Sequence, residues 1–197
     1  MVRKIVVPGE EIEGKGYTNV NVYREKDTSY SAVVGLVEER EGMKKVIPLN
    51  GGYMPRLEDY VVGIITDVKF GGYIVDINCP YHTFLPSRRD YNLCDVVSAQ
   101  VTEVNEIKNV VLSSERRLAG GTVIEISPVK VPRVIGKKSS MLDMIKDKTG
   151  CDVFVGKNGR IWLKNGDIIK AKNAIFLIEK EAHKEGLTDK VKEFLEK

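Results

Sequence analysis

The stretch VIGKKSSMLDMIKDKTGCDVFVGKNGRIWL, residues 134–163, decides the fold of the C-terminal part of this chain. It begins as an apolar strand end that runs into a turn at Gly136, followed by two lysines. Residues 140–148 have the apolar spacing of a short helix, and Gly150 suits the left-handed exit of that helix. Two β-branched runs follow, joined by the Gly-Lys-Asn-Gly turn at 156–159. The order of these parts predicts a small mixed α/β domain.

This order of parts resembles a KH domain, which holds about four nucleotides of single-stranded RNA against a G-x-x-G loop. The resemblance places that loop at 136–139, where the sequence is Gly-Lys-Lys-Ser and the second glycine is missing. We therefore expect weakened KH recognition, although lysines beside a helix start still favour phosphate. The intact G-x-x-G spacing falls in the later hairpin. The candidate RNA-binding residues of this domain are Gly136, Lys137, Lys138, Lys157 and Asn158.

The helices of this region have recognisable ends. Ser140 is expected to cap the first helix, with Asp143 three residues on. A longer helix is predicted from Asp167, with one apolar stripe, and a last short helix over 187–195. Trp162 alternates with two aliphatic neighbours in its strand, so we expect it in the core or at a domain interface rather than against a base.

Before Gly120 the chain predicts β structure throughout. Turn signals are frequent, and no segment of helical period competes with the short β-rich runs between them. These runs are 31–38, 60–68, 73–77, 95–103 and 110–113. Short strands at this spacing are typical of small barrels or sandwiches, and the Gly120-Gly121 pair marks the change to the mixed domain.

Three segments in order resemble the RNA-binding domain first described in ribosomal protein S-one, a five-stranded OB-fold barrel. They are EDYVVGIITDVKFGGYIVDI, FLPSRRD and DVVSAQVTEVNEIKNVVLSS. Phe70 and Tyr73 occupy the two aromatic positions of that domain. Such rings can stack on bases, but we expect Phe70 to fill the core and weigh core and base contact evenly for Tyr73. Pro86 and Thr83 depart from the family pattern, so a histidine and a glycine common there are missing. The candidate phosphate-binding residues of the barrel are Arg88, Arg89, Arg116 and Arg117.

The basic residues are not evenly spread. The chain has 197 residues and a net charge of +3, made up of +1 in residues 1–56, −3 in 57–119 and +5 in 120–197. The excess falls on the KH-like part, where an RNA-binding protein needs it. The N-terminal part has little positive potential, so we expect it to be an assembly surface.

Composition argues against catalysis and against metal or cofactor sites. Two histidines and three scattered cysteines offer no zinc or disulfide framework. Asp143 and Asp147 are four residues apart on one helix but lie among lysines, so we read them as solvated. No signal peptide or apolar run of about 20 residues is present, which predicts a cytoplasmic protein without a membrane segment.

The whole chain resembles the KH-containing RNA-binding cap subunit of the archaeal exosome. The resemblance implies an N-terminal β-rich ring-binding domain at 1–56, an S-one-type OB-fold barrel at 57–119 and a KH domain with C-terminal helices at 120–197. It implies that three cap subunits sit on a hexameric ring of RNase-PH-like subunits and bring single-stranded RNA to the central pore, without catalytic activity of their own. The alternative is a transcription-elongation RNA-binding factor with S-one and KH modules. Such factors usually carry two KH domains, and only one fits after residue 120.

Overall fold

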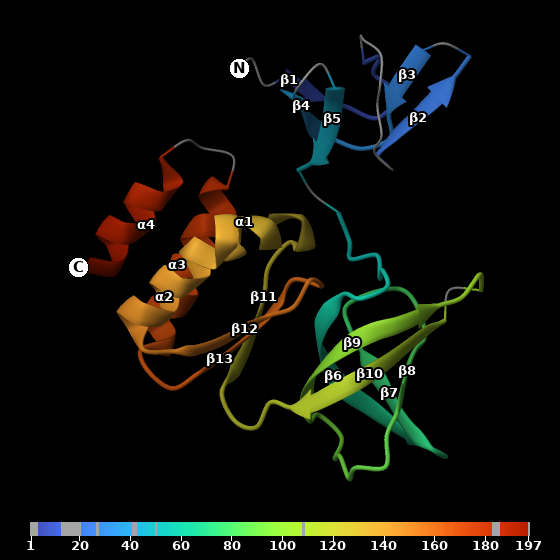
Figure 1. Cartoon of the computed structure of the whole chain (residues 1–197), viewed down its shortest axis with the longest axis vertical. Coiled ribbons are helices and arrows are strands. Elements are labelled where there is room, and N and C mark those ends of the chain that lie inside the picture. Colours follow the sequence, from blue (N-terminus) through green and yellow to red (C-terminus); the bar gives the residue numbers. More distant parts are fainter. Residues whose placement is uncertain are drawn as a thin grey trace. The chain divides into compact units, whose positions relative to one another are not determined.

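The fold comprises two compact units, residues 1–51 and 52–197, each of which is described by itself (Figure 1). The computed structural model describes residues 4–12, 21–26, 28–40, 43–49, 51–107, 109–182 and 186–196. None of the helices in these ranges is long and apolar enough to cross a membrane.

The N-terminal unit is β-rich, as the sequence predicts. Its three-stranded antiparallel sheet has the order β1-β4-β5, and β2 pairs with β3 in a separate hairpin. The strands are β1 (Lys4–Val6), β2 (Val22–Glu25), β3 (Thr28–Ser31), β4 (Gly35–Arg40) and β5 (Met43–Pro48). The expected single strand over 31–38 is wrong: the chain bends at 32–34, where the Ser31 hydroxyl donates a 2.6 Å hydrogen bond to the Val33 carbonyl. Val6, Ile12 and Val46 form the buried core.

A closed five-stranded barrel opens the second unit. Its order is β10-β8-β7-β6-β9, in which only the β8–β10 pair is parallel, so the predicted OB-fold barrel is confirmed. The strands are β6 (Tyr60–Lys69), β7 (Gly72–Asp76), β8 (Thr83–Pro86), β9 (Val96–Val104) and β10 (Val110–Arg117). Tyr53 is buried in the barrel core and its hydroxyl donates a 2.9 Å hydrogen bond to Asp59. The chain therefore contributes to the barrel from before residue 57.

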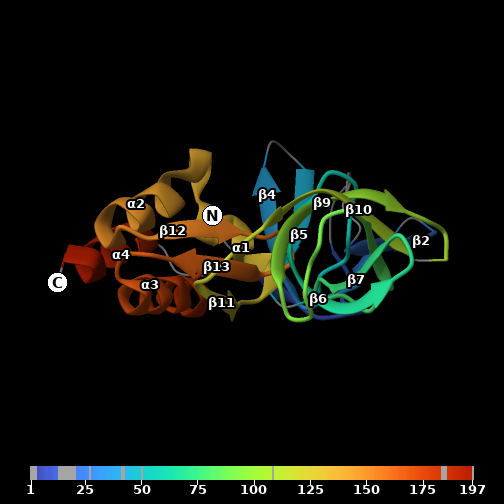
Figure 2. The ribbon, with the colours of Figure 1, turned by 90° about the horizontal axis from the view of Figure 1, so that it is seen from below.

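The rest of the unit is a three-stranded antiparallel sheet, of order β11-β13-β12, with helices on one side (Figure 1). Figure 2 shows the three strands side by side. The elements are β11 (Thr122–Glu125), η1 (Pro128–Lys130), α1 (Val131–Ile135), η2 (Lys137–Ser139), α2 (Ser140–Thr149), β12 (Asp152–Val155), β13 (Arg160–Lys164), α3 (Ile168–Glu181) and α4 (Leu187–Glu196). The apolar faces of all four α-helices and of the sheet enclose one core.

Two local expectations in this region are corrected. The apolar run before Gly136 is helix α1 rather than a strand end, because Pro132 suits the first helical turn and Val131 and Val134 share a buried face. Ser140 does not cap α2: it is the first helical residue, and no side chain caps the helix start. Gly150 does end the helix in the left-handed region, at φ 66°.

Candidate nucleic-acid interface

The two candidate aromatic residues of the barrel have opposite environments. Phe70 lies in the turn between β6 and β7 and is fully exposed, so the expectation that it fills the core is wrong. Tyr73 is 8% exposed and packs edge-on against Tyr91. Its hydroxyl donates a 2.8 Å hydrogen bond to the Arg89 carbonyl and accepts one from the Tyr91 amide. Tyr73 therefore cannot offer its ring to a base, whereas Phe70 can.

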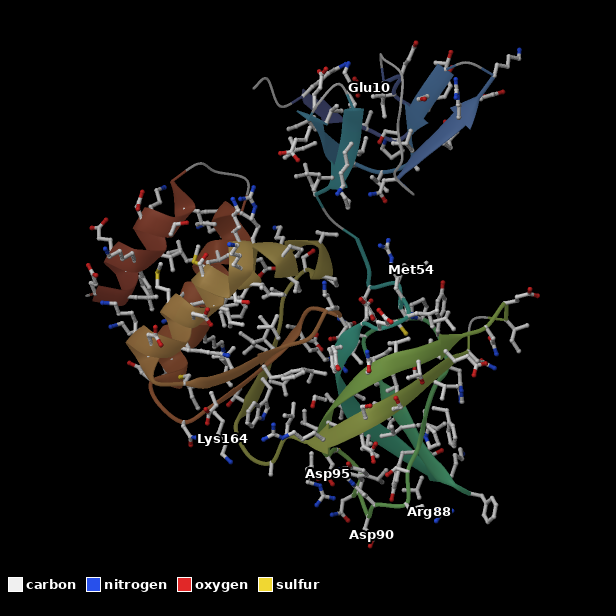
Figure 3. All side chains as sticks on the ribbon, viewed as in Figure 1. Glu10, Met54, Arg88, Asp90, Asp95 and Lys164 are labelled. Carbon is white, nitrogen blue, oxygen red and sulfur yellow. The ribbon has the colours of Figure 1, made fainter. Side chains whose placement is uncertain are left out.

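The four candidate arginines divide into two that are held by acidic partners and two that are not. Arg89 lies 3.8 Å from the Glu115 carboxylate and donates to the Glu115 carbonyl. Arg117 pairs with Asp95 at 2.8 Å, and its guanidinium lies over the Tyr91 ring. The other two are exposed and have no ion-pair partner among the residues that the structure describes; they are Arg88, labelled in Figure 3, and Arg116. These two guanidinium groups can bind phosphate without giving up an existing contact.

A β-bulge in β10 separates Arg116 from the regular part of its strand. The pairing with β9 shifts between Ser113 and Arg116, and Ser114 adopts a positive φ of 53°. The bulge leaves Glu115 facing the β8 side, where its carboxylate accepts a 2.8 Å hydrogen bond from Ser87. A bulge of this kind re-aims the side chains around it.

The turn between α1 and α2 keeps a left-handed backbone although its second glycine is missing. Gly136 has φ 76°, and a Cβ there would come within 2.8 Å of the Met141 amide nitrogen. Lys138 and Ser139 have φ 52° and 63°. Ser139, which stands where the KH pattern has its second glycine, therefore already has a conformation that glycine adopts freely. Lys137 and Lys138 are exposed beside the start of α2, as expected for phosphate-binding groups.

We expect Ser139→Gly to raise the free energy of unfolding by up to about 1 kcal/mol. Relief of about 1–2 kcal/mol of left-handed strain outweighs the entropy cost of glycine, about 0.5–1 kcal/mol. Urea denaturation measures this change. The matched control is Ser140→Gly, one residue later at φ −57° in α2, which should lower stability by about 1 kcal/mol. Equal destabilisation by both variants would contradict the prediction.

The 156–159 hairpin docks on the barrel rather than on a ligand. Asn158 is fully buried, and its Nδ2 donates to the carbonyls of Val62 and Ile77 at 2.7 and 3.0 Å. Its Oδ1 accepts a 3.2 Å hydrogen bond from the Val62 amide. The prediction that Asn158 binds RNA is wrong, because every polar group of its side chain is used. Lys157 has an exposed side chain, while its amide donates to the Tyr60 carbonyl at 2.8 Å.

Gly156 makes this docking possible. A Cβ at this position would lie 2.3 Å from the Asn158 Oδ1 and 2.7 Å from the Val62 amide nitrogen. The hairpin backbone can therefore approach β6 closely only where no side chain intervenes. In this chain the Gly-Lys-Asn-Gly segment docks on the barrel, and its lysine side chain points outward.

Arg160, whose side chain is buried, adds an ionic contact with a half-exposed carboxylate to the same docking surface. Its Nη2 lies 2.6 Å from the Asp76 carboxylate of β7, and its Nε lies 2.7 Å from Glu125. Burial lowers the pKa of Arg160, but the two carboxylates outweigh this and hold it above the ordinary value. Burial likewise raises the pKa of Asp76, yet the hydrogen bonds from Arg160 and from the Asn78 amide keep it below the ordinary value. Sequence reasoning missed Arg160 entirely.

The described residues contain no group of three or more histidine, cysteine or acidic side chains that could hold a metal ion. Asp143 and Asp147 are exposed on α2. The unit formed by residues 52–197 has exposed cationic side chains on the barrel and at the α1–α2 turn, and Phe70 is fully exposed. Such groups bind a polyanion with unpaired bases.

Two family models match separate parts of the chain. Residues 121–169 match the KH domain, and residues 3–50 match the exosome RNA-binding protein RRP4 N-terminal domain. The chain is 41% identical to the exosome complex component Rrp4 of Methanothermus fervidus, over 98% of this chain and 95% of the relative. This chain belongs to the Rrp4 family. The Rrp4 of Picrophilus torridus is also 41% identical, over 100% of this chain and 94% of its own length.

A solved structure resembles the chain as well. It is a crystal structure named for an exosome complex RNA-binding protein, 36% identical, with a TM-score of 0.66 over 74% of this chain and 96% of that one. The resemblance to the KH-containing exosome subunit is thereby confirmed, as is the combination of β-rich, barrel and KH parts.

Proposed function

We propose that this chain is a non-catalytic RNA-binding subunit of an exosome, which caps a ring of RNase-PH-like subunits and leads single-stranded RNA to the central pore. The observation that carries the proposal is near full-length similarity to Rrp4 components, in a chain whose barrel and KH part form one compact unit with exposed cations. Three copies on a hexameric ring is the arrangement we propose. Mixing the chain with such ring subunits and separating the mixture by gel filtration tests the assembly: a stoichiometric complex is the expected result.

In this proposal the RNA lies along the exposed groups of the second unit. Phe70 offers a stacking face, Arg88 and Arg116 bind phosphates on the barrel, and Lys137 and Lys138 bind phosphates at the α1–α2 turn. Lys157, which projects from the docked hairpin, is a further phosphate contact. Arg89 and Arg117 contribute positive potential from their paired positions. Catalysis is left to the ring, because these groups bind anions but provide no nucleophile or general base.

We expect RNA binding to be strongly dependent on salt and weakly dependent on sequence. If about 4–6 phosphates are neutralised, log affinity should fall with log salt concentration at a slope near −3 to −4. Fluorescence anisotropy of labelled single-stranded oligouridylate at several salt concentrations measures the slope. Lys137→Glu should make the slope shallower by about 1. Lys192→Glu, the same charge change at an exposed position of α4, is the matched control and should leave the slope unchanged. A slope near zero would contradict the proposed mode of binding.

A further inference from the structure

The face of the β11-β13-β12 sheet that points away from the helices carries a row of two aromatic side chains and one valine. Trp162 of β13 pairs directly with Phe154 of β12 on one side and with Val123 of β11 on the other. Directly opposed residues of antiparallel strands project to the same face, so these three side chains stand side by side. Their neighbours Ile161 and Leu163 are fully buried on the opposite, helix-covered face. Trp162 is half-buried rather than enclosed in the core.

A groove of about 470 Å³ is lined by the Phe154 and Trp162 members of this row. Its sheet side is lined by Phe154, Trp162 and Lys164, together with Lys146 of α2. Its other side is the end of β10, with Arg116 and Arg117. Figure 3 labels Lys164 on the sheet side and Asp95, the partner of Arg117, on the barrel side. The volume lies within the roughly 300–1,000 Å³ typical of ligand sites.

The groove is positively charged and its aromatic residue is fixed in place. Arg116 and Lys146 have no ion-pair partner in the part of the chain that the structure describes. The Lys164 ammonium donates a 3.0 Å hydrogen bond to the Ala119 carbonyl, which is a neutral partner. The one acidic lining residue, Asp152, accepts a 2.6 Å hydrogen bond from Asn165. The indole Nε1 of Trp162 donates to the Gly120 carbonyl at 2.6 Å, which holds the ring in one orientation.

We propose that this groove binds single-stranded RNA, with a base stacked on Trp162 and adjacent phosphates bound by Arg116 and Lys146. The inference rests on the proposed RNA-binding function and adds a site on the sheet face that the KH loop at Gly136 does not share. A fixed indole surrounded by cations matches an unpaired nucleotide, which has a π-face and a negative charge in each repeat. An acidic protein segment would form ion pairs with the cations but has no base to stack on Trp162.

The chain contains one tryptophan, so its tryptophan emission, excited selectively over that of the tyrosines, reports on this groove. We expect oligouridylate and oligoadenylate each to decrease the tryptophan emission of the full chain in a saturable way. The midpoint should coincide with that of binding measured by anisotropy of the same labelled RNA. Inorganic polyphosphate, which has charge but no bases, should leave the emission nearly unchanged. Arg116→Glu should shift the midpoint to higher RNA concentration and reduce the salt slope by about 1, whereas Lys192→Glu should do neither.

The outcomes separate this inference from the proposed function. RNA binding by anisotropy with constant tryptophan emission would overturn the groove and leave RNA binding intact. Absence of any RNA binding would overturn both. Equal decreases with polyphosphate and RNA, or tight binding of polyglutamate in place of RNA, would also overturn base stacking in the groove. Trp162→Leu should weaken RNA binding about fivefold or more, since stacking contributes about 1–3 kcal/mol per base; the wild-type fluorescence result decides the question even if this variant does not fold.

Discussion

Asn158→Asp is expected to lower the free energy of unfolding by about 3 kcal/mol or more, although it changes one atom of the side chain. Asparagine donates to two buried carbonyls, those of Val62 and Ile77. Aspartate has no donor, so both carbonyls lose their partner and face a carboxylate instead. Each unsatisfied buried group costs about 1–3 kcal/mol, and the buried charge adds to this.

Urea denaturation of the full chain measures this effect, with tryptophan emission as the signal. The matched control is Lys157→Asp, which introduces the same group one residue earlier, where the side chain is exposed. We expect this control to stay within about 0.5 kcal/mol of the wild type. Equal stability of the two variants would show that the docked hairpin does not hold the barrel and the KH part together.

Removal of residues 1–51 is expected to abolish assembly with ring subunits while leaving RNA binding in place. The remainder, 52–197, is a compact unit with its own barrel and KH core. All the exposed cations proposed to bind RNA belong to it. The removed part has a net charge near zero and a β-sheet that can offer edges and apolar groups to a protein partner.

Gel filtration with ring subunits and RNA anisotropy together test this division. The cut must precede Tyr53, because a fragment that starts at 57 would lose a tyrosine from the barrel core. That shorter fragment, 57–197, is the control for a merely unfolded protein and should be less stable than 52–197. Retained ring binding with lost RNA binding in the 52–197 fragment would show that the roles of the two units are reversed.

The sequence predicted the module order because each module has a local pattern. Alternation of apolar residues and frequent turns mark the barrel strands, and a helix between a glycine turn and a hairpin marks the KH part. The same alternation could have placed Tyr73, which shares a strand face with Val75 and is buried with it. Phe70 precedes the turn glycines, outside that register, and is therefore exposed.

The contact of the hairpin with the barrel could not be predicted from the hairpin's own sequence. Asn-Gly is a strong local turn signal, and nothing within it indicates that Asn158 binds a backbone 96 residues earlier in the chain. Arg160, Trp162 and Lys164 were within reach of sequence analysis. They alternate with Ile161 and Leu163, so one face of this strand had to carry polar and aromatic side chains while the other faced the apolar core.

The bonds from Asn158 and Arg160 to the barrel have a consequence for avidity. Because the two modules that we propose to bind RNA are joined by direct side-chain contacts and not by a flexible linker, the distance between their proposed binding surfaces is fixed before RNA arrives. A strand held at one module meets the other at a high effective concentration and at a set spacing. No ordering entropy is then lost in bringing the modules together. An RNA strand long enough to span both surfaces should bind with higher affinity because it makes the second contact, whereas a shorter strand cannot make that contact.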